Sequence, residues 1–98
     1  MSLFELGEVL MTAGVAYLVK DDPQAASEVA ECLGRHALGD WGDLCDEDRE
    51  MNDDAIEAER SGGYTDRLFS VYKTSIGKIY IITEHDRSAT TILLPNEY

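Results

Sequence analysis

The sequence predicts an α+β fold in which N-terminal helices pack on a C-terminal three-stranded antiparallel sheet. In the first half of the chain, apolar residues recur every three or four positions, as on an amphipathic helix. From residue 67 onward, three β-branched and aromatic runs are separated by short turn sequences. With 98 residues, of which 44% are hydrophobic, the chain is long enough for one modest core. We therefore expect a single domain over residues 1–98.

The N-terminal elements carry recognisable start and stop signals. We expect a short strand that ends at Met11, followed by a helix with Thr12 as its N-cap. The next helix begins after Asp22, a good N-cap residue, with Pro23 at its first position. Gly39 ends this helix.

A third helix is predicted over residues 44–60. Asp43 stands where an N-cap is expected. Helical spacing places Leu44, Met51 and Ala55 on one side, so we expect these three residues to attach the helix to the core.

The three C-terminal strands are expected at residues 67–73, 78–84 and 90–95. They are separated by "TSIG" and "HDRSA", which are typical of turns between neighbouring antiparallel strands. The order of the runs therefore predicts a simple meander.

The third predicted helix is strongly acidic. Residues 40–59 contain ten of the twenty acidic residues of a chain whose formal net charge is −12. Like charges one helical turn apart repel by a few tenths of a kcal/mol per pair, so this arrangement carries a cost that alternating lysines would avoid. On one stripe, three or four residues apart, lie Asp43, Asp46, Glu47, Glu50, Asp53, Asp54 and Glu57.

Two interpretations of this stripe are open. Its carboxylates repeat about every 5–6 Å, on the scale of nucleic-acid phosphates, so the helix could fill the groove of a basic nucleic-acid-binding protein or defence complex. Alternatively, the stripe only keeps the protein soluble. Direct binding to nucleic acid or to a membrane is disfavoured, because the chain has few cations to offer a phosphate. Calcium binding is also disfavoured, since "DEDREMNDD" lacks the glycine and final glutamate of an EF-hand loop.

A second group of polar residues could be catalytic. His36, Asp40 and Asp43 flank Trp41, and the segment "TEHDRS" carries Glu84, Asp86 and Arg87. Should the two loops meet, these groups could form a small metal-assisted or acid/base hydrolase. The competing interpretation is that they form ion pairs and turn caps, with His36 at the edge of the core. Trp41 itself either fills the core or is an exposed binding anchor.

Other cofactor and targeting signals are weak. Cys32, His36, Cys45 and His85 lack the paired short spacings of a structural zinc site. There is no glycine-rich phosphate loop, so we expect no metal and no cofactor. The longest apolar run, residues 9–19, is about half of what a bilayer crossing needs. We expect a cytoplasmic monomer with reduced cysteines.

Three strings carry a resemblance to known sequences: "LGRHALGDWGD" (residues 33–43), "RLFSVY" (67–72) and "IITEHDRSATTILLPNEY" (81–98). They resemble a family of small proteins found on plasmids, integrative elements and phages. The "TPG" segment of that family corresponds to Thr12-Ala13-Gly14 here. The family brings no established activity and no catalytic residues.

The resemblance implies a setting rather than a reaction. A passenger of a mobile element must survive the nucleic-acid defences of its host, and small acidic anti-CRISPR and anti-restriction inhibitors commonly fill a basic DNA or RNA groove. This setting favours a non-enzymatic inhibitor over the hydrolase. A toxin–antitoxin or transcriptional accessory protein is a further alternative, and it would need a dedicated partner chain.

Overall fold

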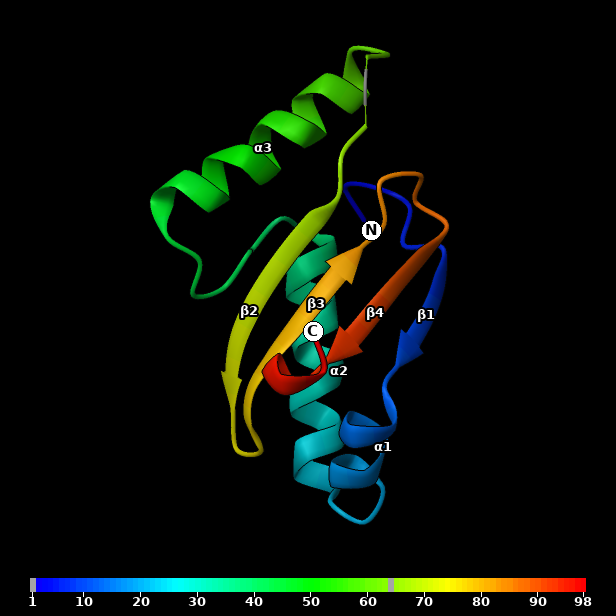
Figure 1. The fold of residues 1–98 in the computed structure, drawn as a ribbon, viewed down its shortest axis with the longest axis vertical. Coiled ribbons are helices and arrows are strands. Elements are labelled where there is room, and N and C mark those ends of the chain that lie inside the picture. The colour runs from blue at the N-terminus through cyan, green and yellow to red at the C-terminus, as the bar shows by residue number, and fades with distance from the viewer. Residues whose placement is uncertain (1, 64) are drawn as a thin grey trace.

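The computed structural model describes residues 2–63 and 65–98. These residues form a four-stranded sheet in the order β1-β4-β3-β2, together with helices that pack on it (Figure 1). The elements are β1 (Glu8–Met11), α1 (Ala13–Val19), α2 (Pro23–Ala37), α3 (Asp46–Arg60), β2 (Leu68–Thr74), β3 (Gly77–Thr83), β4 (Ala89–Leu93) and the short 3₁₀ helix η1 (Pro95–Glu97).

The α+β class is confirmed, but the predicted three-stranded antiparallel sheet is wrong in its strand number. β2, β3 and β4 form the expected antiparallel meander, and β1 adds a fourth strand parallel to β4. Glu8 pairs with Ala89 and Met11 with Ile92, so the pairing joins the two ends of the chain. The apolar pattern indicated a strand ending at Met11, but a pairing across eighty residues leaves no local signal.

The first two helices begin where their capping residues predict. The Thr12 side chain accepts a hydrogen bond from Val15 N–H at 3.4 Å, and the Asp22 side chain accepts one from Ala25 N–H at 3.1 Å. For α3 the prediction of Asp43 as N-cap is wrong. Cys45 occupies the N-cap position and makes no side-chain capping bond.

One face of the sheet is covered by α1 and α2 (Figure 1). Alternate residues of the strands, such as Tyr72, Ile79 and Ile92, point to this side and are almost fully buried. One core cluster therefore lies between these two helices and the sheet, and it consists of Val15, Val29, Cys32, Tyr72, Ile79, Ile81 and Ile92.

A second cluster joins α3 to β2. Trp41 is only 2% exposed and packs with Phe4 in a stacked arrangement, so Trp41 fills the core and is not an exposed anchor. Met51 was predicted to attach α3 to this cluster, but it is 65% exposed. Asn52, at 5% exposure, is buried instead. The apolar members of the cluster are Phe4, Trp41, Leu44, Ala55, Ile56, Leu68 and Val71.

The outer edge of β2 is closed by the segment that precedes and forms α3. Val71 N–H donates to Trp41 O at 3.3 Å, and Asp43 N–H donates to Val71 O at 2.8 Å. The Asn52 side chain continues this pairing at Phe69. α3 therefore lies beside one edge of the sheet, away from β1 at the other edge (Figure 1). Within the described part of the chain, no helix is long and apolar enough to cross a membrane.

Candidate functional site: an acidic helix beside an aromatic pocket

The acidic face of α3 lies opposite the face that packs on the protein. At about 100° per residue, the buried residues Asn52, Ala55 and Ile56 occupy one arc of the helix. Six carboxylates fall on the opposite arc, and all six residues are exposed: Asp46, Glu47, Glu50, Asp53, Asp54 and Glu57. The stripe predicted from the sequence therefore faces outward along the whole helix.

Few cations neutralise this face. In the part of the chain that the structure describes, the ion pairs are Arg35–Asp40, Lys73–Asp43 and Arg87–Glu59. The guanidinium of Arg49, which lies within α3, instead donates to the carbonyl oxygens of Gly42 and Leu44. The outward carboxylates of α3 therefore keep their charge available to a partner.

Two residues of the predicted stripe have additional structural contacts. Asp43 lies in the loop before α3, and its carboxylate is 3.8 Å from Lys73 Nζ. Asp53 Oδ1 accepts a hydrogen bond from Trp41 Nε1 at 2.9 Å. Within residues 2–63 and 65–98, the other five carboxylates make no side-chain hydrogen bond or ion pair: Asp46, Glu47, Glu50, Asp54 and Glu57.

The C-terminal half of α3 is fixed by Arg87, which was predicted as part of a polar site. Its Nε and Nη2 donate to Glu59 Oε1 at 3.0 and 2.8 Å. Its Nη1 donates to the carbonyl oxygens of Asp66 and Glu84 at 2.6 and 3.1 Å. Arg87 is 8% exposed, and its backbone has a positive φ of 59° in the turn between β3 and β4. Its role is therefore to join that turn to α3.

His36 is fully buried, and both of its ring nitrogens are hydrogen-bonded. Nδ1 meets the hydroxyl of Ser70, and Nε2 lies 2.9 Å from Thr83 Oγ1. Thr83 Oγ1 lies 2.8 Å from Thr90 Oγ1, which donates to Leu6 O at 2.7 Å. Burial lowers the pKa of His36 to about 4, so the ring is neutral at pH 7.

The directions of these hydrogen bonds follow from Thr90, the last residue in the series. Thr90 uses its single hydroxyl proton on Leu6 O, so Thr83 donates to Thr90. Thr83 must then accept from His36 Nε2–H, which leaves Nδ1 to accept from Ser70. Both ring nitrogens of His36 therefore have hydrogen-bond partners, and this network holds the imidazole in the core.

The remaining residues of the predicted catalytic group serve local roles. Asp40 accepts two hydrogen bonds from Arg35, at 2.7 and 3.2 Å, and these lower the pKa of the Asp40 carboxyl. Asp86 is exposed and accepts from Ser88 N–H at 3.0 Å, within its own turn. Glu84 is half-buried, and its backbone carbonyl is what Arg87 contacts.

These positions do not join His36, Asp40 and Asp86 in a shared cleft. Two cavities formed by the described residues are lined by other residues. Across residues 2–63 and 65–98, no three His, Cys, Asp or Glu side chains are grouped closely enough to hold a metal ion, which includes the weak zinc candidate.

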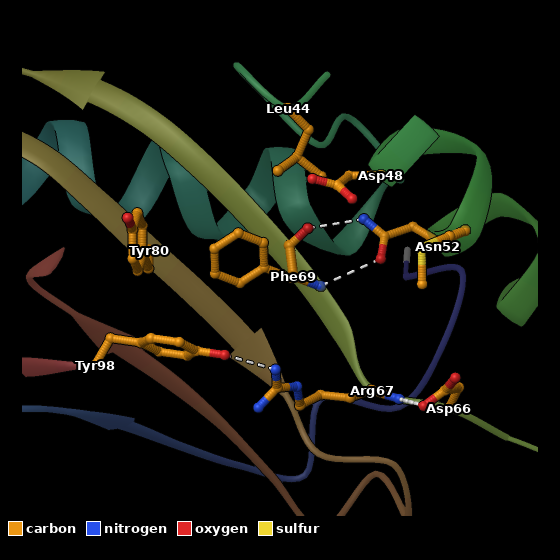
Figure 2. Close-up of a pocket in the computed structure, with 9 residues that line it drawn as sticks. Leu44, Asp48, Asn52, Asp66, Arg67, Phe69, Tyr80 and Tyr98 are labelled. Atoms are coloured by element: carbon orange, nitrogen blue, oxygen red, sulfur yellow. Dashed lines mark hydrogen bonds between the residues drawn. The ribbon is translucent and has the colours of Figure 1, made fainter. Parts of the chain in front are cut away.

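Sequence reasoning missed a pocket of about 430 Å³ between α3, β2, β3 and the C-terminus (Figure 2). Phe69 and Tyr80 lie on the sheet face opposite α2, and Tyr98 follows η1. The alternation of Phe69 with buried Leu68 and Ser70 was the available signal, because it aims the ring away from α2. The lining residues are Leu44, Asp48, Met51, Asn52, Asp66, Arg67, Phe69, Tyr80 and Tyr98.

The sequence segments 33–43, 67–72 and 81–98 meet in the interior. His36 from the first contacts Ser70 from the second and Thr83 from the third. The C-terminal end of the third string also reaches the Thr12-Ala13-Gly14 segment, since Glu97 accepts hydrogen bonds from Thr12 Oγ1 at 2.5 Å and Gly14 N–H at 3.2 Å. The strings thus describe the scaffold, and α3 lies outside them.

Comparison with known proteins adds no further assignment. No protein-family model, curated protein or solved structure matches this chain.

Proposed function

We propose that this protein is a non-enzymatic inhibitor that binds the basic nucleic-acid-binding groove of a host defence nuclease complex. The observation that supports this proposal is the outward face of α3, where six carboxylates lie opposite the buried residues and none forms an ion pair within the described residues. A groove built to bind phosphates presents lysines and arginines, and these would bind the helix face in their place.

The rigidity of α3 supports binding by a preorganised surface. Asn52 joins the middle of the helix to β2, and Arg87 joins its last turn to the β3–β4 turn. Trp41 holds Asp53 from the loop side. Because the carboxylates are borne on a fixed helix, little ordering of the backbone remains to oppose association.

The electrostatic character of the surface supports a fast, salt-sensitive encounter. Opposite charges steer association, and added salt screens them over a distance of about 8–10 Å. The resemblance to mobile-element proteins supports a defence complex as the target. In this proposal the protein acts as a monomer in the cytoplasm and needs neither a metal nor a cofactor.

The direct test is a charge reversal with a matched control. Glu47→Lys, Glu50→Lys and Asp54→Lys together should abolish capture of the target from host lysate and inhibition of the purified complex. The control is Glu8→Lys, Asp21→Lys and Glu31→Lys, which changes net charge equally at exposed positions outside α3. Circular dichroism confirms that both variants fold.

The identity of the captured partner is a separate test of the proposal. The pull-down is run at low and high salt, and the eluates are identified by mass spectrometry. We expect a basic nuclease or guide-RNA complex that is lost at high salt, and added DNA or RNA should compete with the protein. Full inhibition by the folded α3 triple variant would refute the helix face as the binding surface.

A further inference from the structure

The pocket beside α3 has an aromatic wall made of three rings. The centroids of Phe69 and Tyr80 are 4.9 Å apart, and those of Tyr80 and Tyr98 are 5.8 Å apart, both in edge-to-face arrangements. Phe69 and Tyr80 are half-buried, whereas Tyr98 is 65% exposed. An incoming group therefore finds ring faces that are partly open to solvent, two of them on the strands β2 and β3.

The rim of the pocket has an excess of negative charge. Asp48 comes from α3 and Asp66 from the segment before β2, and both are exposed (Figure 2). Arg67 is the one cation among the lining residues. The outward carboxylates of α3 add to the negative potential, because they lie on the same helix as Asp48 and Met51.

The protein itself shows how a guanidinium fits against this wall. The Arg67 guanidinium carbon lies 5.7 Å from the centroid of the Tyr98 ring, and Nη2 donates to Tyr98 Oη at 2.7 Å. Figure 2 shows this hydrogen bond between two of the residues that line the pocket. Tyr98 thus already binds a planar cation, through its hydroxyl oxygen and at the outer limit of the cation–π range.

We propose that the pocket receives an arginine side chain of the basic partner. This inference rests on the proposed function, since it assigns the occupant to the same partner that binds α3. A guanidinium stacks on aromatic rings and forms forked hydrogen bonds with carboxylates, and the aliphatic stem of an arginine packs on apolar side chains. Its charge lies against Asp48 and Asp66, and its stem packs on Met51. Its plane stacks on the aromatic rings of Phe69, Tyr80 and Tyr98.

The probe is N-acetyl-arginine amide, titrated into the full-length protein and followed by NMR. We expect saturable shifts at the ring protons of Phe69, Tyr80 and Tyr98. The control is N-acetyl-citrulline amide, which has nearly the same shape and no charge, and it should bind at least about threefold more weakly. Equal binding of the two compounds would overturn the proposal, as would shifts confined to the outward face of α3.

Two variants test the geometry. Tyr98→Ala, at an exposed C-terminal position, should weaken arginine binding by about three- to fivefold. Arg67→Gln should strengthen it, because this change removes a like charge and frees the Tyr98 ring. Weaker arginine binding in Arg67→Gln would overturn the proposal. Saturable binding of inorganic phosphate at the same rings of the wild-type protein would show an anion site and would overturn it as well.

The failure of this inference is separable from the failure of the proposed function. The triple reversal of Glu47, Glu50 and Asp54 should abolish partner capture while the arginine probe still saturates the aromatic pocket. A variant that still captures the partner would refute the function assigned to α3 and leave the pocket result intact. Absence of saturable arginine binding in the wild-type protein would refute the pocket as an arginine site. The charge-reversal test of the helix face would be unaffected.

Discussion

Asn52 forms two hydrogen bonds with the backbone of Phe69: its Nδ2 donates to Phe69 O at 2.7 Å, and Phe69 N–H donates to its Oδ1 at 3.3 Å (Figure 2). The side-chain amide thus occupies the place of a neighbouring strand at the edge of β2. The same contact connects the acidic face to the aromatic pocket, since Asn52 belongs to α3 and Phe69 to the pocket wall.

Asn52→Leu should lower the free energy of unfolding by about 1–3 kcal/mol. The substitution keeps the size of the side chain but leaves the N–H and C=O groups of Phe69 without these partners. Urea denaturation measures the change. Met51→Ala, at the neighbouring exposed position, is the control and should change stability by less than about 0.5 kcal/mol. Equal effects at the two positions would contradict the anchoring role of Asn52.

Gly42→Ala should destabilise the protein far more than Gly62→Ala. Both glycines have φ of +75°, so each substitution carries the cost of a left-handed backbone, about 1–2 kcal/mol. A Cβ at Gly42 would lie 1.9 Å from Val71 O, whereas nothing lies within 4 Å of one at Gly62. The difference in unfolding free energy therefore isolates the close approach of the loop to β2. Similar values for the two variants would show that the loop moves freely away from the strand.

Arg87→Ala should reduce the free energy of unfolding by an amount on the order of 3 kcal/mol. It leaves Glu59 without its ion-pair partner, and it removes the hydrogen bonds that Arg87 donates to two backbone carbonyl groups. Arg60→Ala, at an exposed position in the same last turn, should have little effect. Hydrogen exchange should also be faster at residues 57–60 in Arg87→Ala. Unchanged exchange there would contradict the role of Arg87 in fixing the end of α3.

His36 should make the stability of the protein fall in mild acid. Its folded pKa of about 4 lies below the ordinary value of 6.5, so the unfolded chain binds more protons between these two values. The contribution is fully present above about pH 6.5 and is lost as the pH falls toward 4. From pH 7 to pH 5 the expected loss is about 2 kcal/mol, measured by urea denaturation.

His36→Gln separates this effect from the titration of the carboxylates. The carboxylates are common to both proteins, so only the histidine contribution should vanish from the pH dependence of the variant. In the wild-type protein, ¹⁵N NMR should show the neutral His36 ring with its proton on Nε2, as the hydrogen-bond chain requires. An equal pH dependence in both proteins, or a proton on Nδ1, would contradict these hydrogen bonds of His36.

The sequence was informative where a local pattern decides the structure. Thr12, Asp22 and Pro23 mark helix starts because capping involves only the next few residues. The meander was likewise predictable, since each strand pairs with its neighbour in sequence. The stripe of α3 was located because helical spacing is regular.

Other features depend on contacts between distant segments. Hydrophobic spacing predicts that Met51 lies in the core. Asn52 is buried instead, because its side-chain amide forms hydrogen bonds with the backbone of Phe69 at the edge of β2. The parallel pairing of β1, the burial of His36 between Ser70 and Thr83, and the aromatic pocket all join residues that are far apart in the chain. Composition and periodicity contain no information about such meetings.

The most acidic element of the chain lies at one side of the sheet. β1 and α3 lie at opposite edges of the sheet, and α3 contains eight acidic and two basic residues of a chain whose formal net charge is −12. In the field of a basic surface, such a charge distribution experiences a torque that turns α3 toward that surface before contact. Because the aromatic pocket adjoins the same helix, the rotation would bring the pocket to the interface as well.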